Sequence, residues 1–354
     1  MSALLIGTYT EPLPHVEGSA SGILTADFVG ARVEPPAPAA TARNPSYLAI
    51  SEDARFVYAV EEAVDGAVTA YDRDPCTGAL TKISRRSSGG SYPCHLAISP
   101  GGGWIVVTNY GGTITVFPIA SDGSLEPISG SAGIDRGDPD ATGVSRPHMA
   151  AFDPETGHLL VADLGLDAIL DYSVSDCGQL TENVESRLSL PPGSGPRHLA
   201  FHPNGSVFFT SNELDSSVAV VRRTATGFAL RNTTSSIPAE FTGRNDVSAI
   251  RVSASGRYVL VANRGMDSIA VLEFDEGSCT LSLVNNVSLG AREPREFAFT
   301  PDGGCVIAAS QNDHQLVTFA FDETTGGLQL LARTPTPSPV CLLFVMISEG
   351  SQCM

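Results

Sequence analysis

The sequence predicts an all-β, seven-bladed β-propeller with four strands in each blade. Three observations support this fold: a motif that recurs six times, abundant glycine and proline, and strand-like segments at the two ends of the chain that complement each other. Glycine and proline contribute 35 and 24 of the 354 residues, which suits many short strands joined by tight turns. No linker or shift in composition divides the sequence, so we expect a single domain over residues 1–354.

The recurring motif is Pro-x-x-Leu-Ala-hydrophobic, followed by a glycine-bearing turn, an apolar run, a polar turn and a segment of alternating apolar residues. Six copies begin at Pro45, Pro93, Pro147, Pro196, Val247 (where the proline is missing) and Pro294. Their spacing of about 45 to 54 residues lies within the range of propeller blades. The wider gaps at 129–145 and 234–246 predict surface loops.

The copy over residues 195–233 shows how a blade divides into four strands. We expect an innermost strand over 198–202, a second over 207–211, a third over 217–222 and a rim strand over 228–232. The first two are almost continuously apolar, which is typical of strands that are packed on both faces. The flat faces of neighbouring blades should therefore bury one another.

The two ends of the chain supply the seventh blade. Residues 3–9 match the second strand of the motif and residues 22–28 match the third, whereas residues 339–344 match the innermost strand. Strands from both termini would thus share one blade. This arrangement closes the ring without leaving an exposed edge strand.

Composition limits the partners and the location of the protein. The formal net charge is −18, and an acidic surface disfavours nucleic acid and anionic membranes. No apolar stretch approaches the roughly 18 residues of a membrane span, and the N-terminus does not resemble a signal peptide. The seven cysteines form no metal-ligand spacing. We therefore expect free thiols, a cytoplasmic location, a small-molecule substrate and no bound metal.

Comparing equivalent positions in the seven blades separates scaffold residues from candidate site residues. A residue that repeats serves the blade, whereas a position that varies is free to bind a ligand. The position that ends the second strand is almost always small and polar, as in Asn109, Asp163, Asn212 and Asn263, and is explained by turn capping. The next position varies, as does the position after the motif proline. Both lie at one end of the channel, because the two inner strands form a hairpin.

The varied positions bring together four candidate catalytic residues: His148, Arg197, Glu213 and Arg264. Arginine presents a planar fork suited to a carboxylate or a phosphate, although Arg197 and Arg264 could instead form structural ion pairs with Glu213. His148 and Glu213 are candidates for proton transfer. Further candidate substrate-binding residues are Arg295, His198, His95, Tyr110, Tyr9 and Gln311. Arg295 ranks lower because it could pair locally with Glu296.

Several segments together resemble a known family: Gly7-Thr-Tyr-Thr10, Asn109-Tyr-Gly-Gly112, Gly195-Pro-Arg-His198, Ser211-Asn-Glu-Leu214 and Asn263-Arg-Gly265. They are similar to the lactonase family of seven-bladed propellers, which includes propeller-type 6-phosphogluconolactonases and fungal carboxy-cis,cis-muconate cyclases. The resemblance covers essentially the whole chain. It implies a cofactor-free enzyme that opens or closes a lactone on an anionic substrate. The histidine, two arginines and glutamate of the muconate cyclase site correspond to His148, Arg197, Arg264 and Glu213. The proline-rich loop 11–21 and the tail 349–354 depart from the family pattern.

Three functions remain open at this point. The first is lactone chemistry, either hydrolytic or cyclising, on a substrate that carries a carboxylate or a phosphate. The second is a cyclase or isomerase, including a pericyclase, of a larger secondary metabolite, to which Tyr9, Tyr110 and Leu164 at the rim would be suited. The third is a non-catalytic binding propeller. A small cavity lined by arginine would favour the first function.

Overall fold

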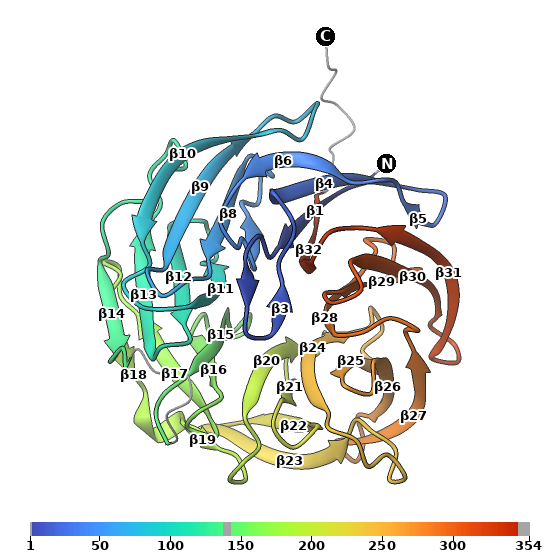
Figure 1. The fold of residues 1–354 in the computed structure, drawn as a ribbon. Helices are drawn as coiled ribbons and strands as arrows, with labels where there is room; N and C mark the ends of the chain where they lie inside the picture. The colour runs from blue at the N-terminus through green and yellow to red at the C-terminus, as the bar shows by residue number, and fades with distance from the viewer. Residues whose placement is uncertain (1, 137–142, 346–354) are drawn as a thin grey trace.

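A computed structural model describes residues 2–136 and 143–345 and shows seven antiparallel sheets arranged as blades around a central channel (Figure 1). The predicted seven-bladed propeller is confirmed, and strands make up almost all of the regular structure. Within the described residues, the one helix is the single 3-10 turn η1 (Val184–Ser186), so no helix is long and apolar enough to cross a membrane.

The strands of each blade run from the channel to the rim in the following order. Blade 1 contains β32 (Pro339–Val345), β1 (Ser2–Thr8) and β4 (Gly22–Val29), with β5 (Arg32–Val33) and β6 (Ala37–Thr41) both paired to β4. Blade 2 contains β7 (Leu48–Ile50), β8 (Phe56–Glu61), β9 (Ala67–Arg73) and β10 (Leu80–Ser87). Blade 3 contains β11 (Pro93–Ile98), β12 (Trp104–Asn109), β13 (Thr113–Pro118) and β14 (Gly130–Gly133). Blade 4 contains β15 (Pro147–Phe152), β16 (Leu159–Asp163), β17 (Ala168–Val174), β18 (Leu180–Glu182) and β19 (Leu188–Ser189).

The remaining blades follow the same order. Blade 5 contains β20 (Pro196–Phe201), β21 (Val207–Asn212), β22 (Ser217–Thr224) and β23 (Gly227–Ser235). Blade 6 contains β24 (Asp246–Val252), β25 (Tyr258–Arg264), β26 (Ser268–Asp275) and β27 (Thr280–Ser288). Blade 7 contains β28 (Pro294–Phe299), β29 (Cys305–Ser310), β30 (Gln315–Asp322) and β31 (Gly327–Pro335).

Blade 1 is built from both ends of the chain, as predicted. β1 pairs antiparallel with β32 on its channel side, with Ala3 opposite Val345, and with β4 on its rim side. In Figure 1 the blue N-terminal strands and the red β32 accordingly lie side by side. The ring is closed by hydrogen bonds within a sheet, so both edges of β1 are paired.

The hydrophobic core is divided among the interfaces between neighbouring blades. Between blades 5 and 6, for example, Phe209 and Val220 pack against Val261, and all three side chains are fully buried. An equivalent cluster joins blade 7 to blade 1 through Ile307 and Leu4. Truncating a buried phenylalanine such as Phe209 to alanine costs about 3–5 kcal/mol of folding stability, so each interface contributes substantially to the closed ring.

Three expectations need correction. The segment 129–145 is not simply a loop, because it contains the rim strand β14; residues 137–142 of it lie outside the described residues. Strand β20 begins at Pro196, two residues earlier than expected. Cys76 is disulfide-bonded, so the expectation of free thiols is wrong there; Cys353 lies outside the described residues. The free cysteines are Cys94, Cys177, Cys279, Cys305 and Cys341.

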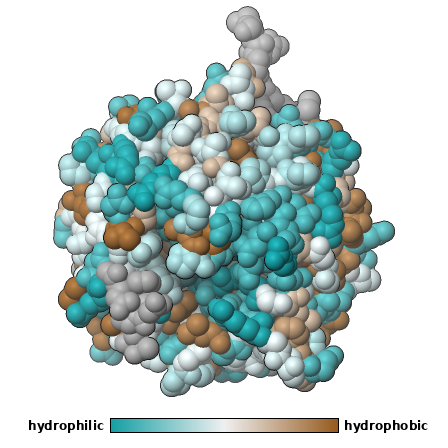
Figure 2. Space-filling model, viewed as in Figure 1, coloured by the Kyte–Doolittle hydropathy of each residue, from teal (hydrophilic) through white to brown (hydrophobic). Residues whose placement is uncertain are grey.

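The proline-rich loop that connects β1 to β4 forms a small additional hairpin, β2 (Pro12–Leu13) and β3 (Val16–Glu17). In the other blades the second and third strands are joined by a short turn, whereas this hairpin extends over the channel toward the centre of the ring (Figure 1). Hydrophilic side chains gather near the centre of the same face (Figure 2). The hairpin and this polar surface mark the end of the channel that holds the candidate site.

Candidate active site

A β-bulge in the innermost strand aims one side chain of a blade into the channel. In blade 5, Pro196 pairs with Asn212 and His198 pairs with Ser211, so Arg197 is the extra residue between them. The residues in the same position of β11, β15 and β28 are Cys94, His148 and Arg295. A bulge changes the direction of one side chain without breaking the hydrogen bonds of the neighbouring strand pairs. The residue after the motif proline can therefore differ from blade to blade while the fold of the blade stays the same.

These side chains meet in a cavity of about 450 Å³ at the mouth of the channel. Six of the ten predicted site residues line it: Tyr110, His148, Arg197, Glu213, Arg264 and Arg295. The cavity is small and rich in guanidinium groups, and its volume is typical of a site for a small molecule. These are the properties that favour lactone chemistry over the turnover of a larger apolar metabolite.

Glu213 forms ion pairs with two of the arginines. Its Oε2 lies 2.9 Å from Arg197 Nε and 3.1 Å from Arg264 Nη2; the Arg197 contact is an ion pair without the alignment of a hydrogen bond. Burial alone would raise the pKa of Glu213, but Arg264 and Arg197 hold it below its usual value. Burial lowers the pKa of Arg197 to about 10, which leaves it charged at neutral pH. The structural ion pair considered from the sequence is therefore present.

Arg295 differs from these two arginines because it makes no ion pair or hydrogen bond with any described residue. Its guanidinium carbon lies 5.4 Å from the ring centre of Tyr9 in a cation–π contact. The expected local pairing with Glu296 is wrong, since Glu296 instead forms an ion pair of 2.8 Å with Arg251. Arg295 is therefore the guanidinium group that remains open to an anionic ligand.

His148 is a neutral imidazole in this environment. Burial, together with the positive charges of Arg197 and Arg295, holds its pKa well below the usual value of 6.5. The ring contacts Tyr110 and His198, with centroid distances of 5.8 and 5.4 Å. At neutral pH, His148 can thus offer one hydrogen-bond donor and one acceptor, but it carries no charge.

The other four predicted residues do not line the large cavity. Tyr9 is fully buried, and its hydroxyl donates a 2.9 Å hydrogen bond to Glu62 Oε2. His95 stacks on Tyr47 at 4.0 Å, and Nε2 of His198 lies 3.2 Å from Arg197 Nη1. Gln311 Nε2 donates to the carbonyl oxygen of His15 at 3.1 Å. These residues support the walls of the site and the hairpin above it.

Several cavity residues were missed by the sequence analysis. Glu62 occupies the same varied position as Glu213 and could have been selected on that basis. Leu13, Pro14 and His15 come from the hairpin, and no blade pattern predicts where its tip lies. Burial, Arg295 and Arg264 lower the pKa of His15 to about 3, so its imidazole is also neutral at neutral pH.

The charged residues that line the large cavity are four arginines and three carboxylates. Within residues 2–136 and 143–345, no group of three or more histidine, cysteine, aspartate or glutamate side chains is arranged to hold a metal. The carboxylate that contacts the arginines, Glu213, is already neutralised by them. The fold and the site together define a propeller with an arginine-lined cavity whose volume suits a small molecule.

The chain belongs to the seven-bladed β-propeller lactonase family, whose model matches residues 3–344. The 6-phosphogluconolactonase of Bacillus subtilis is 36% identical over 348 residues, which cover 96% of this chain and 97% of that protein. The 6-phosphogluconolactonase of Yersinia pestis is 30% identical over 292 residues, covering 81% and 83%. The structure of the periplasmic gluconolactonase of Pseudomonas aeruginosa superimposes with a TM-score of 0.89 at 32% identity, covering 98% of this chain and 99% of that one. The protein is thus a lactonase-type enzyme, and a non-catalytic propeller is not supported.

Proposed function

We propose that the protein hydrolyses the lactone ring of a small anionic sugar lactone, with a phosphorylated gluconolactone as the preferred substrate. The observation that carries this proposal is the guanidinium group of Arg295, which faces the cavity without an ion-pair partner among the described residues. Its N–H groups make no hydrogen bond with a described residue, so an anionic ligand or a developing oxyanion can accept hydrogen bonds from them.

The cavity offers separate positions for the two ends of such a substrate. A second, much smaller cavity adjoins the large one. Arg264 and His15 line the large cavity but not the small one, so they suit the anionic group of the substrate. Arg295 and Arg197 line both the large and the small cavity, so they suit the carbonyl group of the lactone. Preorganised donors that face a developing oxyanion contribute strongly to acyl-transfer catalysis.

The proposed substrate agrees with the relatives named 6-phosphogluconolactonase and with the cavity volume of about 450 Å³. We also place the enzyme in the cytoplasm, because five of its described cysteines are free thiols. The disulfide-bonded Cys76 argues against this location. Cell fractionation followed by the lactonase assay tests it directly.

The experiment that tests the function is a comparison of three substrates, with the spontaneous rate subtracted for each. Purified protein is assayed with 6-phosphogluconolactone, with gluconolactone, which lacks the charged group, and with a carboxymuconate. We expect the highest kcat/KM for the phosphorylated lactone. Equal kcat/KM for the two lactones would contradict the anion site, and activity confined to the muconate would replace hydrolysis with cyclisation.

A further inference from the structure

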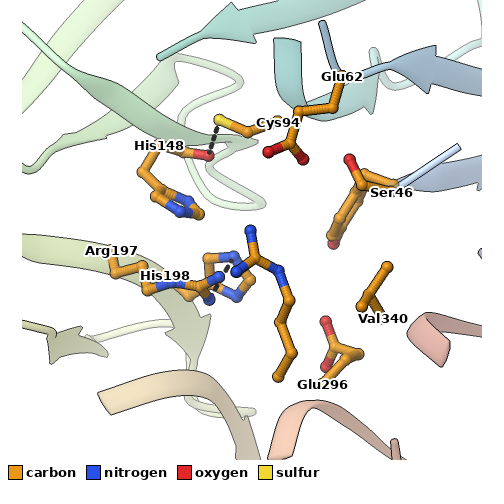
Figure 3. Close-up of a pocket in the computed structure, with 10 residues that line it drawn as sticks. Ser46, Glu62, Cys94, His148, Arg197, His198, Glu296 and Val340 are labelled. Atoms are coloured by element: carbon orange, nitrogen blue, oxygen red, sulfur yellow. Dashed lines mark hydrogen bonds between the residues drawn. The ribbon is translucent and has the colours of Figure 1, made fainter. Parts of the chain in front are cut away.

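A second, much smaller cavity adjoins the first and shares part of its lining; Figure 3 shows the residues around it. Its volume is about 10 Å³, which is room for about one water molecule. The residues that line both cavities are Glu62, Cys94, His148, Arg197 and Arg295. Because the cavities share these residues, a molecule in the small cavity lies next to the proposed substrate site.

Four buried side-chain atoms of residues that line the small cavity have no hydrogen-bond partner among the described residues: Ser46 Oγ, His148 Nδ1, His198 Nδ1 and Arg197 Nε. Arg197 Nε has Glu213 as an ion-pair partner, whereas the other three atoms have no partner, and Ser46, His148 and His198 are only 5%, 6% and 3% exposed. Buried polar groups in native proteins nearly always have a partner, supplied by the protein or by ordered water. Three orphaned groups around one small space therefore indicate a bound polar molecule.

The hydrogen positions on His198 can be assigned from its neighbour. Arg197 Nη1 lies 3.2 Å from His198 Nε2, and a guanidinium group can only donate, so Nε2 is the acceptor. Burial and Arg197 hold the pKa of His198 well below its usual value. The neutral ring therefore carries its proton on Nδ1, and that N–H donor requires an acceptor in the small cavity.

The charges around this cavity select a neutral occupant. Glu62 and Glu296 would repel an anion, whereas Arg197 and Arg295 would repel a cation. Water satisfies both conditions: it accepts from His198 Nδ1–H and can donate to an acceptor such as the hydroxyl oxygen of Ser46. The rings of His148 and His198 have centroids 5.4 Å apart, a separation that one bridging water can span.

We propose that the small cavity binds the water molecule that attacks the lactone, and that Glu62 is the general base that activates it. This inference rests on the proposed lactone hydrolysis and assigns a role to a residue that the sequence analysis did not select. The carboxylate of Glu62 and the imidazole of His148 point toward the same central space (Figure 3). Glu62 is 8% exposed and is oriented by the hydroxyl of Tyr9, which bonds one of its two oxygens.

Glu62 is better placed for this role than Glu213. Glu213 Oε2 is in contact with two guanidinium groups, which stabilise the carboxylate and weaken it as a base. Glu213 also lines only the large cavity, whereas Glu62 lines both. Oε1 of Glu62 accepts no hydrogen bond from a described residue and can take a proton.

The proposed step balances without a further reactant. The water oxygen forms a bond with the acyl carbon while Glu62 takes one proton, and the negative charge on the carbonyl oxygen develops near Arg295 and Arg197. The bond between the acyl carbon and the ring oxygen then breaks, and the protonated Glu62 returns its proton to that oxygen. The product is an open hydroxy acid, which loses its acid proton to solvent.

The test compares Glu62→Gln with Glu213→Gln and with the control Glu61→Gln in the lactonase assay. Glutamine keeps an acceptor for Tyr9 but cannot take a proton, so we expect Glu62→Gln to lower kcat by roughly 10²- to 10⁴-fold with little change in melting temperature. Glu61 is the adjacent glutamate but pairs with Arg85 at 2.8 Å, outside both cavities. Glu61→Gln should keep its kcat, and Glu213→Gln should raise KM more than it lowers kcat.

Two further measurements separate a base from a structural residue. Added formate should restore part of the activity of Glu62→Ala, because a small carboxylate can occupy the vacated space. A high-resolution crystal structure should show a water within hydrogen-bond distance of His198 Nδ1. If the wild-type protein hydrolyses lactones while Glu62→Gln keeps near-wild-type kcat, or if an ion occupies the small cavity, this inference is wrong. A wild-type protein without lactonase activity would instead refute the proposed function.

Discussion

Replacing Arg295 by methionine should separate catalysis from stability. Removing the guanidinium group of Arg295 breaks no ion pair and no hydrogen bond with a described residue, and methionine retains much of the apolar length of the side chain. We therefore expect the free energy of unfolding to change by no more than about 1 kcal/mol. Loss of one preorganised donor at the developing oxyanion should lower kcat by about 10²- to 10³-fold.

Arg197→Met is the matched comparison, because it removes a guanidinium group from the same cavity. The Arg197 side chain is 3% exposed and pairs with Glu213 at 2.9 Å. Breaking a buried ion pair costs about 3–5 kcal/mol, and we expect the lower end of this range because Glu213 keeps Arg264.

Chemical denaturation and steady-state kinetics on both variants provide the test. The expected pattern is loss of kcat in both variants and loss of stability in Arg197→Met alone. If Arg295→Met retains kcat within about threefold, or is destabilised as strongly as Arg197→Met, the assignment of Arg295 as the open cation is refuted.

Three other predictions follow from the fold and the buried histidines. Deleting residues 338–354 removes β32, so hydrogen-exchange protection of residues 3–8 should be lost; protection that persists there would contradict the shared blade. Burial depresses the pKa of His95 to about 3 and those of His148 and His198 well below 6.5. The unfolded chain then binds more protons, so stability should fall as pH drops below about 6.5, by about 1.4 kcal/mol per pH unit for each histidine. The free energy of unfolding, measured between pH 5 and 8, should therefore change less steeply with pH in His95→Phe than in the wild type. Exhaustive chelation should leave lactonase activity unchanged, because the described residues offer no cluster of metal ligands; activity that calcium restores would contradict this.

The blades and their closure could be predicted from the sequence because both depend on local patterns. The motif proline, the apolar runs and the turn residues recur in each copy, and residues 339–344 carry the one inner strand that the N-terminal segment lacks. Comparing blades also singled out His148 and Arg197, which line the large cavity, because the bulge keeps the same place in the motif while its side chain varies.

The pairing of charges could not be predicted in the same way. Arg295 and Glu296 are neighbours in sequence, yet the bulge sends Arg295 into the channel while Glu296 reaches Arg251 on the adjoining blade. The contact between Tyr9 and Glu62 joins residues 53 positions apart. The tip of the β2–β3 hairpin is placed by contacts such as that of Gln311 with the His15 carbonyl. These contacts depend on how blades are oriented toward one another, which a repeated motif does not encode.

The pairing of β1 with β32 has a consequence for how the protein is made in the cell. During translation, β1 leaves the ribosome before the other strands of the ring, whereas its partner β32 is synthesised only after all the intervening blades. Until then the inner edge of β1 is an unpaired strand edge, which can pair with other chains. Contacts between such distant segments also form slowly. The nascent ring is therefore open for most of its synthesis, and chaperones that shield strand edges should matter more for its yield than for its final stability.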